Sequence, residues 1–312
     1  MSFTAVRIAI GRALLVFGIL ALLFIPYVLW GTGIVAAQHQ AALRQQFEAA
    51  RRHAGVATPP ATPPHPTGPP RVAPPTPDPA VGSPVGQLSI PALGLTTVVV
   101  EGTSEAQLQM GPGHYPGTPL PGQAGNAAIA GHRTTYLHPF YSLDHLRPGD
   151  PVTVVTLQGT FTYRVTGSQV VAPDDVSPVA PTPTPELTLT TCTPLYSASE
   201  RLVVHATLTA SILAGAAVPG STTTPSTTPS VASAGRSRPP ATAAGLAGGT
   251  GSWLPALVWG LVLLALAGAV AALARGRSRR ARVATCLAGA AVGLVVLFYF
   301  YGAVTPLLPA SF

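Results

Sequence analysis

The stretch Leu187-Thr-Leu-Thr-Thr-Cys-Thr-Pro-Leu-Tyr-Ser-Ala-Ser-Glu-Arg-Leu-Val-Val-His-Ala-Thr-Leu208 contains two runs of β-forming residues joined by a polar connection. Leu and Thr alternate before Cys192, which is typical of a strand with one face in a core. The second run starts at Arg201, after eight connecting residues. If the strands pair antiparallel with Cys192 opposite Arg201, their Cβ atoms lie about 5 Å apart on one face. The stretch therefore predicts a hairpin that brings a thiol and a guanidinium together.

Upstream segments of the same kind extend this hairpin into a domain. They are short, β-branched and separated by Gly or Pro, and they cover residues 88–90, 96–100, 127–130, 152–157 and 161–165. Together with 187–191 and 202–208 they make about seven strands, and residues 140–150 are expected to hold one short helix. This spacing predicts a mainly β domain, a closed barrel or a sandwich, over residues 86–210.

The composition places this domain in a membrane protein. Only 9% of the 312 residues are charged, 47% are hydrophobic and 35 are Pro; ordinary globular proteins have about 25% charged residues. The net charge of +7 divides into +4 for residues 1–85, −4 for 86–210 and +7 for 211–312. Because the folded domain is mildly acidic, we expect no nucleic-acid partner.

Three apolar runs are long enough to cross a lipid bilayer, which takes about 20 residues of helix. They predict transmembrane helices at residues 13–37, 253–274 and 283–304. The five Arg of residues 275–282 indicate the cytoplasmic side, so residues 1–12 are also expected inside, and the domain and the tail 305–312 outside. The first run exceeds the apolar core of a signal peptide, about 7–15 residues, and is interpreted as an uncleaved anchor.

Two linkers are expected on either side of the domain. Residues 38–85 form a Pro-rich spacer, which within residues 57–84 should be an extended polyproline segment. Residues 211–252, rich in Ser, Thr, Pro and Gly, are expected to be a flexible linker.

Of the two cysteines, Cys286 lies in the third apolar run, so Cys192 is the only cysteine in the external part. A free thiol has a pKa near 8.5, and its use as a nucleophile requires a base or a positive neighbour. Arg201 is positioned to hold a thiolate or the oxyanion formed when the thiolate attacks a carbonyl. The competing interpretations are an inert buried Cys192 and a solvated Arg201 at the end of a strand.

The base is expected to be a histidine. His205 shares the face of Cys192 but lies about 13 Å down the strand, too far for proton transfer. His132 ends a predicted strand and His114 lies in a predicted loop, and spacing alone does not choose between them. No HExxH or CxxC spacing occurs, so we expect no metal and no cofactor.

Three motifs together resemble the sortases, membrane-anchored cysteine transpeptidases of Gram-positive cell walls. Thr188-Leu-Thr-Thr-Cys192 resembles the family's TLxTC signature, Gly131-His-Arg133 its histidine motif, and Glu200-Arg-Leu-Val-Val-His205 its arginine strand. The runs Tyr115-Pro-Gly-Thr and Gly125-Asn-Ala-Ala-Ile-Ala-Gly-His-Arg-Thr-Thr-Tyr136 are similar to the class E sortases of actinobacteria.

The resemblance implies a role for each matching residue. Cys192 is implied as the nucleophile, His132 as the general acid and base, and Arg201 as the group that holds the oxyanion; Tyr115 and Thr191 are expected to help read the sorting signal. The implied partners are secreted proteins with a Leu-Ala-x-Thr-Gly or Leu-Pro-x-Thr-Gly signal, a peptidoglycan precursor amine and the lipid bilayer. The implied location is the cell membrane, with a sortase-type barrel outside.

Some features depart from class E and keep other interpretations open. Many class E sequences have His where this chain has Thr193, and C-terminal spans are more typical of class C enzymes, which polymerise pilins on a lysine acceptor. Class C enzymes often carry an Asp-Pro-aromatic lid, whereas Asp78-Pro-Ala80 lacks the aromatic. A non-catalytic membrane scaffold with a degenerate barrel is a further alternative. The Ser-x-Gly-Cys motif of L,D-transpeptidases is not found around Cys192.

Overall fold

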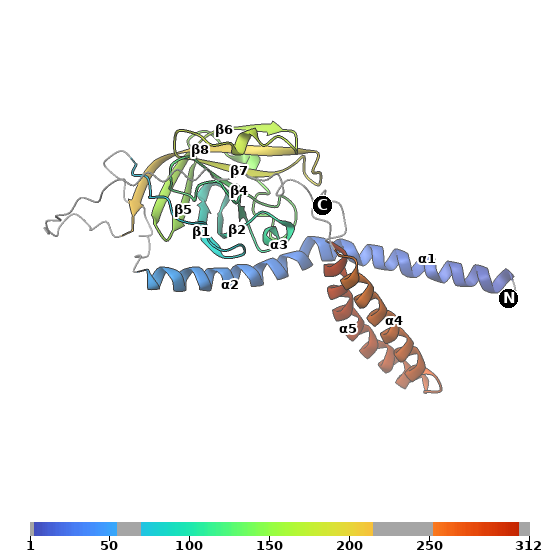
Figure 1. The fold of residues 1–312 in the computed structure, drawn as a ribbon. Helices are drawn as coiled ribbons and strands as arrows, with labels where there is room; N and C mark the ends of the chain where they lie inside the picture. The colour runs from blue at the N-terminus through green and yellow to red at the C-terminus, as the bar shows by residue number, and fades with distance from the viewer. Residues whose placement is uncertain (1–2, 55–69, 215–251, 306–312) are drawn as a thin grey trace. The chain divides into compact units, whose positions relative to one another are not determined.

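The computed structural model describes residues 3–54, 70–214 and 252–305. The chain forms two compact units, one made of residues 1–35 with 249–312 and the other of residues 36–248. The second unit contains the predicted β domain, and the first contains the long apolar helices (Figure 1).

Within residues 70–214, eight strands form a closed barrel in the order β1-β2-β3-β4-β7-β8-β6-β5. Their bounds are β1 (Pro84–Ile90), β2 (Leu95–Glu101), β3 (Gly113–His114), β4 (Asn126–Ala130), β5 (Pro151–Thr156), β6 (Gly159–Val171), β7 (Glu186–Thr193) and β8 (Glu200–Leu213). The closed barrel confirms the predicted fold class. The seven predicted segments are all strands, and the two-residue strand β3 was missed because Gly-His carries no β pattern.

Alternation along the strands separates the inside of the barrel from the outside. Leu187 and Leu189 of β7 join the buried core, whereas Thr188 and Thr190 point to the opposite face. On β8 the core residues are Leu202, Val204 and Ala206. The barrel is therefore filled by one face of each strand, as the Leu/Thr pattern predicts.

Strand direction brings three strand ends to one mouth of the barrel. β4 and β7 pair in parallel with Ala130 opposite Thr190, so their carboxyl ends lie together. β7 and β8 pair antiparallel, which places the first residues of β8 at the same level. This mouth is where the sequence places Cys192, His132 and Arg201.

Short helices occur in the connections between the strands of the barrel. They are α3 (Glu105–Leu108) and the 3₁₀ turns η2 (Pro91–Leu93), η3 (Leu143–His145) and η4 (Ser177–Val179). The short helix expected within residues 140–150 is confirmed as η3.

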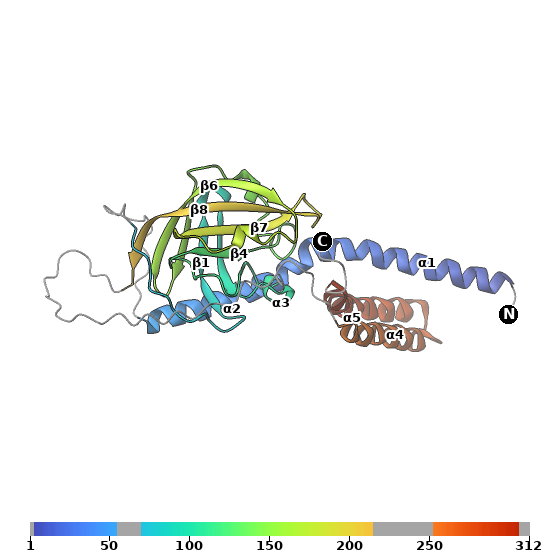
Figure 2. The same cartoon turned by 45° about the horizontal axis from the view of Figure 1, so that its top comes forward.

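Helix α2 (Thr32–His53) occupies part of the predicted spacer. Leu43 and Phe47 are each 1% exposed, and Leu43 packs on Val98 and Val100 of β2. The Gln40 amide binds both backbone groups of Val98, at 2.8 and 2.9 Å. Residues 38–53, predicted as part of a Pro-rich spacer, are therefore a helix packed along the barrel (Figures 1 and 2).

The rest of the predicted spacer is described only from residue 70 onward. Ala73 forms a β-bridge with Gln123, and the Gln123 side chain donates to the Thr76 hydroxyl at 3.0 Å. The end of the segment thus lies on the barrel. Residues 55–69 and 215–251 lie outside the described residues, so the polyproline and flexible-linker predictions remain predictions there.

The other unit contains α1 (Phe3–Pro26), the π-helical turn η1 (Tyr27–Gly31), α4 (Leu254–Ala274) and α5 (Arg279–Val304). In the described part of the chain, α4 and α5 are long and apolar enough to cross a membrane. They match the two predicted C-terminal spans, although α5 begins four residues early and includes three Arg of the predicted loop. The N-terminal span at residues 13–37 stays a prediction.

Aromatic side chains join α1 and η1 to α5 within this unit. The Tyr301 hydroxyl donates to the Leu20 carbonyl at 2.5 Å, and the Tyr27 ring lies 5.2 Å from that of Phe298 and 5.4 Å from that of Tyr301. The N-terminal and C-terminal helices are therefore in direct contact.

Candidate active site

The predicted hairpin is present with the predicted register. Cys192 of β7 lies opposite Arg201 of β8, and the two strands are joined through residues 194–199. Thr188 lies opposite His205, four residues down β8 from Arg201. The His205 ring contacts the Thr188 hydroxyl at 3.2 Å, so it belongs to the middle of the strand rather than to the mouth.

Cys192 is partly buried at the mouth. Burial raises the pKa of its thiol, while the guanidinium groups of Arg201 and Arg133 lower the pKa and offset part of that rise. The thiol is therefore mostly protonated at neutral pH in the free protein. A nucleophilic role requires that its proton leaves as the substrate binds or reacts.

His132 follows the end of β4 on the same strand face as Ala128 and Ala130. Gly131 precedes it, and a Cβ there would come within 2.6 Å of the Phe140 ring, so this close approach requires glycine. Continuing the β4/β7 register beyond Ala130 and Thr190 brings His132 to the level of Cys192. The pairing of β4 with β7 therefore places the acid–base and nucleophile candidates on adjacent strand ends.

The His132 imidazole is half-buried and incompletely satisfied. Its Nε2 atom is enclosed and has no hydrogen-bond partner among the described residues, and its ring lies 5.1 Å from that of Tyr136. Burial lowers the pKa of His132 to about 4, so the ring is neutral at pH 7. A neutral ring with an unpaired nitrogen is ready to accept or pass on a proton.

Arg201 is 8% exposed, and its Nη1 donates to the carbonyl oxygens of Ala198 at 2.9 Å and Glu200 at 3.1 Å. These bonds fix the guanidinium against the β7–β8 connection on the face of Cys192. Arg201 is therefore a nearly buried cation held beside the thiol, which excludes the interpretation of a solvated strand-end charge.

Tyr115, expected to help read the signal, packs against Ala128 and Ala130 of β4. Its hydroxyl is 3.0 Å from that of Thr190, and burial raises its pKa, with the Thr190 hydrogen bond and the Arg201 charge opposing that rise. A small pocket beside it is lined by Tyr115, Thr190, Arg201 and Val203 and closed by Pro178 and Val179 of η4. Thr190 was not singled out from the sequence, although the TLxTC match contains it.

Thr191, the other expected signal-reading residue, points to the opposite face of β7. Its hydroxyl donates to the Gly131 carbonyl at 2.7 Å and it is 3% exposed. The structure thus attaches Thr191 to the backbone just before His132, and brings Thr190 rather than Thr191 to Tyr115.

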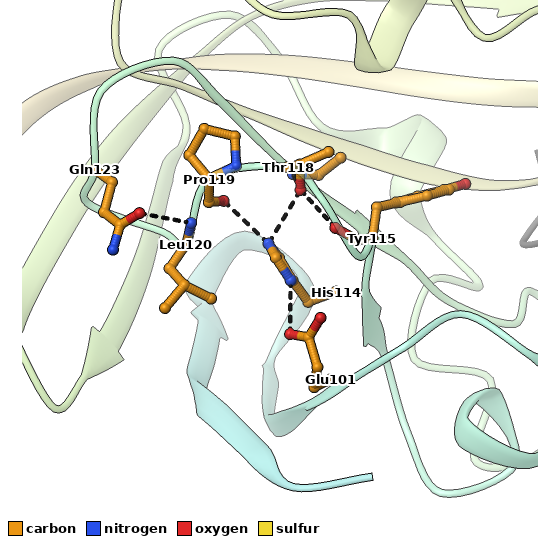
Figure 3. Close-up of polar contacts among 8 residues, drawn as sticks. Glu101, His114, Tyr115, Thr118, Pro119, Leu120 and Gln123 are labelled. Carbon is orange, nitrogen blue, oxygen red and sulfur yellow. Dashed lines mark hydrogen bonds and ion pairs between the residues drawn. The ribbon is translucent and has the colours of Figure 1, made fainter. Parts of the chain in front are cut away.

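His114, the alternative base, lies in a separate buried cluster (Figure 3). Its Nδ1 is 2.8 Å from the Glu101 carboxylate, and its Nε2 is 3.0 Å from the Pro119 carbonyl and 3.1 Å from the Thr118 hydroxyl. A carbonyl only accepts, so Nε2 carries a hydrogen, and one further proton lies between Nδ1 and Glu101. The pair is neutral overall and fully hydrogen-bonded.

This cluster supports Tyr115 from behind. The Thr118 hydroxyl donates to the Tyr115 carbonyl at 2.8 Å and accepts from the Ala128 amide at 3.3 Å. Spacing could not separate His114 from His132, whereas burial does: His114 is 0% exposed and both of its ring nitrogens are occupied.

Arg133 also lies at the barrel mouth. The sequence predicted no role for it beyond its place in the Gly131-His-Arg133 motif. Arg133 is 6% exposed, and its guanidinium binds the Cys192 carbonyl, the Thr193 hydroxyl and the Asp144 carboxylate. The signal in the sequence is an arginine that follows His132 in the Gly131-His-Arg133 motif, three residues after the end of β4. Among the described residues, no group of three His, Cys, Asp or Glu side chains could hold a metal ion.

Taken together, the mouth holds a thiol, two buried guanidinium groups and a neutral imidazole with an unpaired nitrogen. This set can attack a carbonyl, hold the resulting oxyanion and transfer a proton to a leaving group. It defines a cysteine acyl-transfer site on a closed β-barrel.

Comparison with known proteins gives this site a family. Residues 88–209 match the sortase domain. The chain is 34% identical over 216 residues to sortase SrtE1 of Streptomyces coelicolor, covering 63% of this chain and 55% of that protein, and 32% identical over 131 residues to sortase D of Bacillus subtilis, covering 41% and 65%. The chain belongs to the sortase family of cysteine transpeptidases, and its similarity to Streptomyces relatives is to class E. It spans between about half and two thirds of the length of these two relatives.

Solved structures of class E members are also similar. Sortase E of Streptomyces avermitilis is 39% identical with a TM-score of 0.41, covering 45% of this chain and 97% of that one. Sortase E1 of Streptomyces coelicolor, solved with a tripeptide in its active site, is 32% identical with a TM-score of 0.41, covering 42% of this chain and 91% of that one.

Proposed function

We propose that this chain is a membrane-anchored, class E-like transpeptidase that cleaves a Leu-Ala-x-Thr-Gly or Leu-Pro-x-Thr-Gly signal between Thr and Gly and transfers the protein to a cell-wall amine. The observation that carries the proposal is the register of Cys192 opposite Arg201 at a barrel mouth where the His132 Nε2 atom is unpaired. The family supports the reaction class.

The proposed reaction has two halves, formation of a thioester on Cys192 and its transfer to an amine, and His132 passes on a proton in both. His132 accepts the proton of the Cys192 thiol as the thiolate forms a bond to the Thr carbonyl carbon, and Arg201 holds the oxyanion. The C–N bond to Gly then breaks, and the leaving amine takes that proton from His132. An acceptor amine attacks the resulting thioester and gives its proton to His132, and this proton returns to the released Cys192 thiolate.

Positioning of the signal is proposed to involve Tyr115 at the pocket beside Arg201. Tyr115 and Thr190, whose hydroxyl oxygens are 3.0 Å apart, both line this pocket. Thr191 is proposed to contribute by holding Gly131, and through it the start of the His132 segment.

The location proposed for the catalytic barrel is the outer face of the membrane. The Arg cluster between α4 and α5 favours a cytoplasmic loop, which places the chain before α4 outside. This arrangement also requires that the N-terminal apolar run crosses the bilayer. An enzyme so anchored meets secreted substrates and wall precursors where both occur.

The test uses the full chain in detergent with Cys286→Ala, which removes the second thiol. The protein is incubated with a Leu-Ala-x-Thr-Gly peptide and an amine acceptor, and mass spectrometry follows the transfer product and an acyl adduct on Cys192. We expect both to form, and neither with Cys192→Ala. Product formation by Cys192→Ala would overturn the mechanism, and absence of an adduct in the Cys192-containing protein would overturn the function.

A further inference from the structure

Arg133 connects three segments at the barrel mouth. Its Nη1 donates to the Thr193 hydroxyl at 2.7 Å and to the Cys192 carbonyl at 3.3 Å. Its Nη2 lies 3.0 Å from an Asp144 carboxylate oxygen, and its Nε donates to the Tyr141 carbonyl at 3.4 Å. All three guanidinium nitrogens therefore have partners. Nη1 binds residues of β7, whereas Nη2 and Nε bind the segment that contains η3.

The strand pattern explains why Arg133 reaches this place. Beyond the last β4/β7 pair, Ala130 with Thr190, the same register brings residue 132 to the level of 192 and residue 133 to the level of 193. The bond from Arg133 to Thr193 fits that register. His132 and Cys192 therefore share one face of the two strand ends, and Arg133 and Thr193 share the other.

We propose that Arg133 is a positioning residue of the acyl-transfer site, which locks the Cys192 peptide to the strand end that carries His132 and adds a second positive charge beside the thiol, a charge that Asp144 partly neutralises. The inference rests on the proposed function and assigns Arg133 and Asp144 roles beyond it.

Arg133 can fix the Cys192 backbone because its guanidinium is planar and carries donors on two edges. Two donors on one edge bind consecutive residues of β7, and the other edge binds Asp144 and Tyr141, so the orientation of the Cys192 backbone is fixed from outside its own hairpin. Arg133 is 6% exposed, which keeps water from replacing these bonds. Lysine, with a single ammonium, preserves the charge but cannot bind both edges.

The charge acts on the thiol together with Arg201. The titratable and charged groups near Cys192 are Arg201 from β8, Arg133 after β4, Tyr115 after β3 and, at the same level of the strand register, the neutral His132. Both arginines lower the pKa of the Cys192 thiol against the rise caused by burial. The Asp144 side chain, 46% exposed, pairs with Arg133 and opposes its effect.

The two roles give variants with opposite signs. Arg133→Gln removes a positive charge and is expected to raise the thiol pKa by about one unit. Asp144→Asn keeps a hydrogen-bond acceptor for Nη2 but removes a negative charge, so it is expected to lower the thiol pKa by less than that. A purely structural contact would loosen the mouth in both variants and shift the pKa in one direction.

The experiment measures the alkylation rate of Cys192 by iodoacetamide against pH, using the full chain in detergent with Cys286→Ala. The alkylation measurement needs no peptide turnover, so its failure is distinguishable from failure of the proposed function, and only the Arg133→Lys comparison adds a transfer assay. Arg133→Lys is expected to keep the thiol pKa within a few tenths of a unit while peptide transfer falls about tenfold or more. Thr193→Val, the matched uncharged control, is expected to leave the thiol pKa unchanged.

Opposite shifts in Arg133→Gln and Asp144→Asn support the proposal. An unchanged titration in Arg133→Gln, or a shift of Asp144→Asn in the same direction, overturns it. Should Arg133→Gln not fold, as judged by circular dichroism, Asp144→Asn and Arg133→Lys carry the test: an upward or absent shift in the first, or wild-type transfer in the second, overturns the proposal.

Discussion

Two histidines of the barrel unit, His114 and His132, differ fully in how their ring nitrogens are hydrogen-bonded. His114, in the cluster behind Tyr115, has a partner on both ring nitrogens and is 0% exposed. His132, at the mouth, has an enclosed Nε2 without a partner among the described residues. Native proteins satisfy buried polar groups where only stability is at stake. The contrast supports the proposal that the first histidine stabilises the barrel and that the second takes part in the chemistry.

The largest difference between the His114 cluster and the mouth is expected in the rate of peptide transfer, on substitution of His132. His132→Asn should reduce the rate of peptide transfer by about 10²- to 10⁴-fold, because it removes general acid–base catalysis. Its free energy of unfolding in urea should stay within about 0.5 kcal/mol of the wild type, since the ring makes no hydrogen bond through Nε2. Transfer at the wild-type rate would remove His132 from the mechanism.

His114→Ala is expected to act on the fold instead. It leaves the Glu101 carboxylate, 1% exposed, without its partner, and breaking such a buried pair costs about 3–5 kcal/mol. Urea denaturation of the full chain in detergent, followed by fluorescence, measures the loss. The double variant Glu101→Ala with His114→Ala serves as control and should lose less than the sum of the two single variants. Additive losses would show that the pair is not coupled.

A pH dependence of stability should also distinguish the mouth. The pKa of His132 is lowered to about 4 by burial, whereas that of an unfolded histidine is near 6.5. Between these values the unfolded chain binds one proton more than the folded chain, so stability falls as the pH falls through this window. The loss is about 3 kcal/mol by pH 4. Denaturation of His132→Asn at pH 7 and pH 4 should show a loss smaller by that amount; equal losses would contradict the assignment.

The smallest effect on peptide transfer is expected at Tyr115, which contacts both the His114 cluster and the barrel mouth. Tyr115→Phe keeps the ring over the pocket and removes the hydroxyl that contacts Thr190, at about 1 kcal/mol. In peptide kinetics this should raise KM several-fold with little change in kcat. Thr190→Val tests the same contact from the other side, and the double variant should be no worse than either single one. A fall in kcat alone would indicate that Tyr115 acts on chemistry rather than on the signal.

Much of the fold is predictable because local patterns determine it. The Leu/Thr alternation of 187–191 predicts a strand, and the assumption that Cys192 lies opposite Arg201 in a hairpin is confirmed by the β7–β8 register. The short β3 and the packing of α2 were missed for a physical reason. A two-residue strand has no period, and a polar helix contacting the barrel through Gln40, Leu43 and Phe47 resembles a solvated linker until its partner surface is known.

The candidate site is predictable in part for similar reasons. Cys192 and Arg201 lie in one hairpin, so their proximity follows from sequence. His132 and His114 both lie near strand ends, and only burial and the Glu101 contact separate them. The contact of Tyr115 with Thr190 and the contacts of Arg133 depend on long-range pairing of β4 with β7, which spacing does not encode.

The two hydrogen bonds between the Gln40 amide and the Val98 backbone bear on the choice of a fragment for expression. The amide accepts from the Val98 N–H and donates to the Val98 carbonyl, in the way that a neighbouring strand would. A fragment that starts at residue 86, the predicted edge of the domain, loses this side chain and uncovers the apolar surface of Val98, Val100 and Met110. An open strand edge of this kind recruits other chains and promotes aggregation. We therefore expect a fragment that keeps α2, and so begins before Gln40, to aggregate less than one that begins at residue 86.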